Sequence, residues 1–205
     1  MNNLKSWANY ERYSEANKSI GNPIAVFMGD SIFDNWCKME ESYFTENNFL
    51  CRAIGGQVTA QMLSRFRADV INLHPKVVVI LAGTNDIALN NQYIPFEHIV
   101  ENIISMVELA QIHGIKPIII SLLPADKYPW RPEVTDSTKQ IIQVNKLLES
   151  YAKLNGVSYI DLFTVMKDEN QALPLKISLD GVHPNLEGYA IMGPIIKEEI
   201  LRLAH

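Results

Sequence analysis

Four short segments of this chain carry side chains and glycines suited to acyl transfer. They are Gly29-Asp30-Ser31, Ile54-Gly55-Gly56-Gln57, Gly83-Thr84-Asn85-Asp86 and Asp180-Gly181-Val182-His183. In this order they supply a hydroxyl group, glycine backbone amides, a side-chain amide, and a carboxylate beside an imidazole. Nucleophilic catalysis through an oxyanion needs each of these parts. One such segment would carry little weight, whereas the ordered set predicts a serine-dependent hydrolase.

Ser31 is the predicted nucleophile. A serine hydroxyl reacts only weakly unless a base lies beside it, and His183 is the best base because it lies in a turn next to a carboxylate. Asp180 comes three residues before this histidine and would bond the second ring nitrogen, which fixes the tautomer. Asp161 is the rival acid, although we expect it to cap the helical turn that follows it.

The predicted oxyanion donors are the backbone N–H groups of Ser31 and Gly56 and the side-chain amide of Asn85. Gly55 is the alternative glycine. A turn asparagine commonly bonds its own backbone, so the catalytic interpretation of Asn85 depends on the other three segments. We expect Asp86 to hold the loop that presents Asn85.

Four further residues are predicted to contact the substrate, because they lie in or near the loops expected to surround the site. They are Asp30, Trp36, Tyr128 and Trp130. The segment Tyr128–Arg131 joins aromatic rings to an arginine, which favours a sugar as part of the substrate. The alternative is that the aromatic side chains pack against the edge of the sheet.

The elements that must position these residues alternate between short apolar runs and longer amphipathic stretches. The predicted strands are 24–28, 49–53, 77–82, 117–122 and 157–161. The predicted helices are 59–71, 95–113, 137–155 and 185–203. Continuous apolar runs indicate strands that are buried on both faces, as in a parallel sheet. The pattern predicts an α/β fold, a three-layer α/β/α sandwich with right-handed crossovers.

In such a sheet the reacting groups gather beyond the carboxyl ends of the strands. With a flavodoxin-like strand order, 2-1-3-4-5, the first strand lies between the second and the third. Ser31 follows the first predicted strand, Gly56 the second and Asn85 the third. This order would therefore bring all three residues to one crevice.

We expect one domain over residues 1–205, with residues 1–20 as a helical extension that packs on it. Leu4, Trp7 and Tyr10 fall on one side of this predicted helix and would cover the sheet. The segment 125–135 carries two prolines and is predicted to be the longest irregular loop.

Composition and charge exclude several classes of protein. The net charge is −5 and no basic cluster is present, which argues against nucleic-acid binding. No apolar run is long enough to insert across a membrane. The first residues lack the apolar core of a secretion signal, so the protein is expected in the cytoplasm, or exported with its leader already removed. Cys37 and Cys51 could pair, but two cysteines do not form a disulfide framework, and we expect free, mostly buried thiols. No His or Cys cluster has the spacing of metal ligands.

The four segments resemble the sequence blocks of the SGNH hydrolases, also called GDSL esterases and lipases. The positions that match are Ser31, Gly56, Asn85, Asp180 and His183. The resemblance runs from about residue 24 to the last predicted helix. It implies a flavodoxin-like fold, no metal, no organic cofactor, and hydrolysis of a small-molecule ester. Ile32 stands where many members have leucine, and Gly55-Gly56-Gln57 replaces the commoner pairing of glycine with an acid. Neither change removes a catalytic group.

The predicted activity is hydrolysis of carboxylic esters through an acyl-enzyme on Ser31. Short acyl groups are favoured, above all an O-acetyl group on a carbohydrate. A lysophospholipase or thioesterase-like activity is the first alternative, and a non-catalytic module that binds carbohydrate or a partner on the same fold is the second. A nucleotide-binding protein is disfavoured because no G-x-G-x-x-G follows the first strand.

Overall fold

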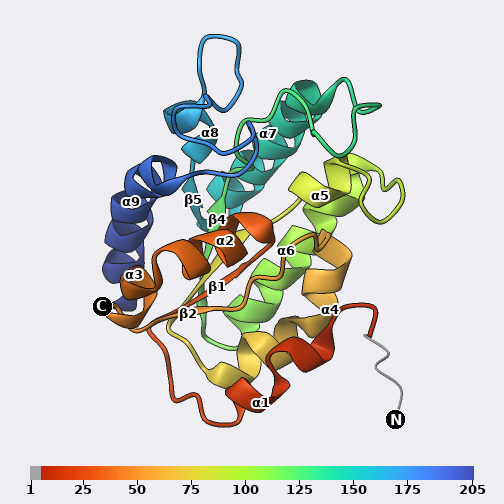
Figure 1. The fold of residues 1–205 in the computed structure, drawn as a ribbon. Helices are drawn as coiled ribbons and strands as arrows, with labels where there is room; N and C mark the ends of the chain where they lie inside the picture. Colours follow the sequence, from red (N-terminus) through yellow and green to blue (C-terminus); the bar gives the residue numbers. More distant parts are fainter. Residues whose placement is uncertain (1–5) are drawn as a thin grey trace.

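A five-stranded parallel sheet lies at the centre of the protein, in a computed structural model that describes residues 6–205 (Figure 1). Its strands are β1 (Ala25–Gly29), β2 (Phe49–Cys51), β3 (Val77–Leu81), β4 (Lys116–Ile120) and β5 (Ser158–Ile160). Their order is β2-β1-β3-β4-β5, and every neighbouring pair is parallel. The predicted strands, their order and the α/β fold class are therefore confirmed.

Helices cover both faces of this sheet (Figure 1). One face carries α4 (Thr59–Asp69), α6 (Phe96–Ile112) and α7 (Ser137–Asn155), and the other carries α2 (Ser31–Met39), α3 (Glu41–Thr45) and α9 (Leu186–Ala204). Successive strand side chains point to opposite faces. Val26 and Met28 therefore pack with the first group of helices, and Ala25 and Phe27 with the second. Because both faces are covered, the strands read as unbroken apolar runs.

The four predicted helices are all present as α4, α6, α7 and α9, and the prediction for 137–155 has the same bounds as α7. Three shorter helices were not predicted, namely α2, α3 and α5 (Thr84–Ile87). A fourth, α8 (Leu162–Met166), is the helical turn that was expected after Asp161. A short 3-10 helix, η2 (Ile71–Leu73), follows α4. In α3 and α5 there are too few turns for an apolar period to stand out.

The N-terminal segment differs from the single helix that the sequence predicts. It forms a 3-10 turn, η1 (Tyr10–Arg12), and one helical turn, α1 (Ser14–Asn17). Asn9 has φ 52°, in the left-handed region, which breaks any helix there. The segment packs along α4 and not on the sheet (Figure 1), and the Trp7 and Tyr10 side chains are exposed. Leu4, the third apolar residue of the predicted helix, lies outside the described residues.

The prediction of two free thiols is wrong, because Cys37 and Cys51 form a disulfide. Cys37 lies near the end of α2 and Cys51 at the end of β2, and their Cα atoms are 6.4 Å apart. Helix α2 crosses the sheet on the side of β2, so the two side chains meet across this packing. The sequence did not indicate that crossing, because α2 was not predicted.

The carboxyl edge of the sheet carries the long irregular segments. The segment 121–136 contains no helix or strand, as expected, but the segment 167–185 also contains none and is longer. The chain turns tightly where β1 ends at Gly29. A Cβ atom there would lie 2.8 Å from the Phe33 ring and 2.9 Å from the Leu81 carbonyl oxygen. Glycine therefore lets α2 begin directly at the edge of the sheet, with Ser31 as its first residue.

Candidate active site

Ser31, His183 and Asp180 form a continuous hydrogen-bonded chain. Ser31 Oγ lies 2.9 Å from His183 Nε2, and His183 Nδ1 lies 2.8 Å from Asp180 Oδ2. A carboxylate can only accept a hydrogen bond, so this geometry assigns the ring proton to Nδ1. Nε2 is then the acceptor for the Ser31 hydroxyl. The structure thus brings together the three residues that the sequence predicted to react.

The Asp180 carboxylate is held by the backbone of its own turn. The backbone N–H groups of Val182 and His183 donate to its Oδ1 at 3.0 and 2.9 Å. Partial burial favours the neutral acid, but these bonds and the His183 ring outweigh it, and the pKa of Asp180 is lowered. The carboxylate is therefore charged beside the imidazole at neutral pH.

A backbone hydrogen bond closes the turn that carries His183, and a capped helix follows it. Leu179 N–H donates to the His183 carbonyl oxygen at 2.7 Å, and Gly181 between them has φ 82°, a conformation that favours glycine. The Asn185 side chain then accepts from Gly188 N–H and caps α9. A closed turn followed at once by a capped helix fixes the imidazole relative to the sheet.

The two glycines after β2 have different surroundings. Gly55 N–H donates to Asp34 Oδ2 at 3.3 Å, so this amide is already engaged. Gly56 has φ 79° and faces a depression that Ser31 and His183 also line. These contacts favour Gly56 over Gly55 as the amide that can reach a bound molecule.

Asn85 lies in the short helix α5 with its side chain almost fully buried. Its Nδ2 donates to the Gln57 carbonyl oxygen at 3.1 Å, and its Oδ1 accepts from Asn90 Nδ2 at 2.5 Å. Asn90 Oδ1 in turn accepts from Trp130 Nε1 at 2.9 Å. The Asn85, Asn90 and Trp130 side chains are therefore joined by hydrogen bonds. These bonds orient the Asn85 amide nitrogen toward the glycine loop.

Asp86 has the structural contacts that we expected. Its carboxylate accepts from the Thr59 backbone N–H and from Thr59 Oγ1 at 2.9 and 2.7 Å, and so joins α5 to the first residue of α4. Burial raises the pKa of Asp86 to about 6, although the bonds from Thr59 oppose the shift. Asp161 likewise caps α8 by accepting from Thr164 N–H, so Asp180 is the carboxylate that contacts His183.

The reacting groups open onto a depression of about 240 Å³. Its lining residues are Ser31, Gly56, Asn85, Asn90, Trp130 and His183. Asn90 was not predicted, although its position five residues after Asn85, just beyond α5, was a signal that it could share the site. The Trp130 ring lies 5.7 Å from the His183 ring and is partly exposed, so this predicted contact residue does reach the site.

The other three predicted substrate contacts are wrong, because their side chains are buried away from the depression. Asp30 accepts from Ile32 N–H and caps α2. Trp36 stacks on Tyr43 and Tyr189 inside the core. Tyr128 is buried beneath the loop that exposes Trp130. None of the three lines the depression.

Asp30 leaves a buried carboxylate directly beneath the site. Its Oδ2 has no hydrogen-bond partner among residues 6–205. Burial raises the pKa of Asp30 to about 6, against the opposing effects of the Ile32 N–H bond and of His183. This group is therefore charged at neutral pH at a cost to the stability of the fold.

The described residues include neither a metal-binding cluster nor a membrane-spanning helix. Across residues 6–205, no three His, Cys, Asp or Glu side chains gather as metal ligands would. Within the same residues, no helix has the length and apolar character needed to cross a bilayer.

Comparison with known proteins gives a consistent result. Residues 27–191 match the GDSL-like Lipase/Acylhydrolase family. The fold is similar to that of a GDSL-like lipase from Bacteroides thetaiotaomicron, with 41% identity, a TM-score of 0.93, and coverage of 96% of this chain and 99% of that one. Platelet-activating factor acetylhydrolase IB subunit alpha2 of Rattus norvegicus is 27% identical over 187 residues, 88% of this chain and 77% of that protein.

A further relative matches over a smaller part of its length. Acetylxylan esterase of Xylanibacter ruminicola is 30% identical over 150 residues, which span 64% of this chain and 30% of that protein. The family match covers Ser31, Gly56, Asn85 and the Asp180–His183 turn. This chain therefore belongs to the GDSL-like lipase/acylhydrolase family, a family of carboxylic ester hydrolases.

Proposed function

We propose that this protein hydrolyses esters of short acyl groups, with an acetyl ester of a carbohydrate as the favoured substrate. The observation that carries the proposal is the Ser31–His183–Asp180 chain, which opens beside Gly56 and Asn85. Nucleophile, base, acid and oxyanion donors then surround one small space.

His183 is the general base in the first half of the reaction. Nε2 accepts the Ser31 proton as Oγ attacks the ester carbonyl carbon, and the imidazolium that forms is stabilised by the Asp180 carboxylate. When the tetrahedral intermediate collapses, the carbon–oxygen bond to the alcohol breaks and His183 returns its proton to that oxygen. The acyl group remains on Ser31.

The oxyanion of this intermediate is stabilised by three donors. Ser31 N–H is at the start of α2, where the first amides of a helix have no acceptor within it. Gly56 N–H and Asn85 Nδ2 line the same depression. Losing one such donor typically lowers turnover by about 10²–10³.

Water completes the cycle. His183 takes one proton from a water molecule, whose oxygen attacks the acyl carbon under the same three donors. Collapse of the second intermediate breaks the bond to Oγ, and His183 returns the proton to Ser31. The products are a carboxylic acid and an alcohol, and the enzyme is restored.

The size of the depression supports a short acyl group. A volume of about 240 Å³ holds a small acyl group and part of an alcohol, and the lining is made of a few polar groups and one indole ring. The names of two relatives, an acetylhydrolase and an acetylxylan esterase, also point to acetyl groups. The exposed Trp130 beside Asn90 offers an apolar face and an amide, a combination suited to a sugar.

A longer acyl chain is the second candidate, and one observation favours it. Leu175, Leu179 and Leu186 are exposed on and just after the segment that carries His183. Such side chains could contact the alkyl part of a lysophospholipid beyond the depression.

The experiment compares hydrolysis of p-nitrophenyl acetate, butyrate and octanoate by the wild type, Ser31→Ala and His183→Ala, with a chelator present. We expect fast turnover of acetate, a decline with chain length, and loss of at least about 10³ in kcat in both variants. Acetylated xylo-oligosaccharides and lysophosphatidylcholine then separate the two substrate classes. Rapid cleavage of the lipid without release of acetate from the sugar would overturn the carbohydrate proposal. Unchanged turnover in Ser31→Ala would overturn the mechanism.

A further inference from the structure

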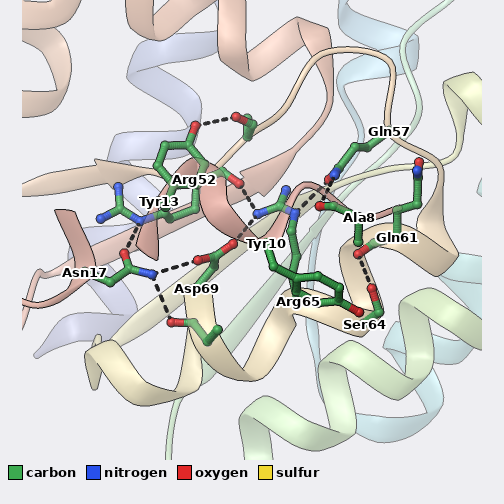
Figure 2. Close-up of polar contacts among 12 residues, drawn as sticks. Ala8, Tyr10, Tyr13, Asn17, Arg52, Gln57, Gln61, Ser64, Arg65 and Asp69 are labelled. Atoms are coloured by element: carbon green, nitrogen blue, oxygen red, sulfur yellow. Dashed lines mark hydrogen bonds and ion pairs between the residues drawn. The ribbon is translucent and has the colours of Figure 1, made fainter. Parts of the chain in front are cut away.

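The N-terminal segment contacts the loop that carries Gly56. We call residues 6–18 the N-terminal strap and residues 53–57 the glycine loop. The strap lies before residues 27–191, the part of the chain that matches the family. Figure 2 shows its polar contacts with the glycine loop and with α4. The strap therefore lies against the loop that carries one of the proposed oxyanion donors.

Gln57 is the central contact between the strap and the site. Its Nε2 donates to the Ala8 carbonyl oxygen at 2.7 Å, and its Oε1 accepts from Arg65 Nε at 2.7 Å (Figure 2). Its own backbone carbonyl accepts from Asn85 Nδ2 at 3.1 Å. Gln57 is thus peptide-bonded to one oxyanion donor, Gly56, and hydrogen-bonded to another, Asn85.

The strap also holds the start of the glycine loop. Tyr13 Oη donates to the Ala53 carbonyl oxygen at 2.5 Å, and the Tyr13 ring lies 4.6 Å from the Arg52 guanidinium. Arg12 lies 3.8 Å from Asp34, whose carboxylate accepts from Gly55 N–H. The strap therefore contacts the loop directly before and after its two glycines, and it reaches Gly55 through Asp34 of α2.

A buried polar cluster anchors the far end of the strap (Figure 2). Asn17 donates to Asp69 Oδ1 at 2.7 Å and accepts from Arg52 Nε at 2.8 Å. Arg65, which is fully buried, donates to Asp69 and to the Arg52 carbonyl oxygen. Because these charges have been removed from water, displacing Asn17 would leave buried groups without partners. The cluster therefore keeps the strap in one position.

We propose that the N-terminal strap is a positioning element for the oxyanion site, and that Gln57 is the residue through which it acts. The inference rests on the proposed function, since it assigns a purpose to Gly56 and Asn85 in that reaction. A donor stabilises an oxyanion only when it is held at hydrogen-bonding distance before the charge develops. The strap holds the glycine loop at that distance without touching the substrate.

The test uses the full chain with Gln57→Glu. A glutamate keeps the size of the side chain and an acceptor for Arg65 Nε, but it presents no donor to the Ala8 carbonyl oxygen. The contact with the strap is lost while the contact with α4 remains. Tyr13→Phe is the second variant, since it removes one hydroxyl and retains the ring over Arg52. Lys18→Ala is the matched control, because within residues 6–205 the Lys18 ammonium pairs with the exposed Glu15 of the same strap and with no residue of the glycine loop.

Turnover is measured with p-nitrophenyl acetate per active site, after titration of the reactive serine. We expect Gln57→Glu to lower kcat by about tenfold and Tyr13→Phe by about threefold, both less than full loss of a donor. KM should stay the same in both variants. The apparent pKa of the pH–rate profile should stay the same in Tyr13→Phe, because this variant adds no charge near His183. Phenylboronic acid, which forms a tetrahedral adduct with a reactive serine, should bind more weakly by the same factors. Lys18→Ala should match the wild type throughout.

The alternative is that the strap only stabilises the fold. In that case the variants would have a lower Tm but a wild-type kcat per titrated site and wild-type affinity for phenylboronic acid. That result in both variants would overturn the proposal. It would leave the proposed function intact, because the loss of activity in Ser31→Ala tests that function separately.

Discussion

Asn85 can serve an oxyanion only if its amide nitrogen, and not its oxygen, faces the site. Two contacts require this orientation: its nitrogen donates to a carbonyl oxygen, and its oxygen accepts from Asn90. The second hydrogen of the amide nitrogen is then available to a ligand. Asn90, which sequence reasoning missed, therefore has a defined role as a positioning residue.

The variant Asn90→Asp tests this role at the residue scale. A carboxylate would replace the donor that faces Asn85 Oδ1 and would repel that oxygen, while it could still accept from Trp130 Nε1. We expect kcat for p-nitrophenyl acetate to fall by about tenfold or more with little change in Tm. Trp130→Phe is the control for loss of the indole donor alone and should have a smaller effect. Wild-type kcat in Asn90→Asp would contradict the role.

The buried Asp30 carboxyl group should make the stability of the fold depend on pH. Burial raises the pKa of its carboxyl group in the folded protein to about 6, from 3.8 in the unfolded chain. A raised pKa gives stability that is complete below the unfolded value and is lost as the pH rises through the folded value. Over about two pKa units this amounts to about 3 kcal/mol. The wild type should lose this contribution between pH 4 and pH 6.

Asp30→Asn removes the charge and keeps an oxygen that can accept from Ile32 N–H and cap α2. The free energy of unfolding, measured with urea, should be similar in the two proteins at pH 4. At pH 8 the variant should be more stable by about 3 kcal/mol. A difference that does not vary with pH would show that Asp30 titrates normally.

At the scale of elements, the disulfide ties the helix that begins with Ser31 to the strand that leads to Gly56. It links Cys37 and Cys51, 14 residues apart. Closing a loop of this length restricts the unfolded chain and is worth about 3 kcal/mol. Cys37→Ala together with Cys51→Ala should lower the free energy of unfolding by about that amount.

A reductant separates this effect from local packing. It should destabilise the wild type and leave the double variant unchanged in the same urea titration. Thiol titration of the unfolded, unreduced wild type should find no free thiol. Two free thiols would contradict the disulfide and restore the expectation from the sequence.

The elements also show what the sequence could predict. Strands and long helices repeat their pattern over enough residues to be seen, and the order of the motifs along the chain placed the site at the carboxyl edge. Helix α2 was missed, although Ile32, Phe33 and Trp36 have helical spacing and Asp30 is a good cap. Without that helix, neither the burial of Trp36 nor the meeting of the two cysteines could be foreseen.

Contacts between distant segments were beyond a reading of the sequence. The strap does not form an amphipathic helix, because its backbone carbonyls at Trp7 and Ala8 are taken by the side chains of Gln61 and Gln57. No pattern in the sequence of the strap itself predicts these hydrogen bonds, because their donors lie about 50 residues further along the chain. Tyr128 and Trp130 are two residues apart in one loop, yet one is buried and the other lines the site. Only the packing of that loop decides between them.

At the scale of the whole molecule, the site joins the two ends of the chain. Ser31 and His183 are 152 residues apart, and every neighbouring pair of strands in the sheet is parallel. Parallel pairing requires long connections to close first, which makes such folds slow to form. A refolding or newly synthesised chain would acquire its sheet before the last loop and helix dock. Esterase activity should therefore appear only at the final step of folding, after the spectroscopic signal that reports formation of the sheet.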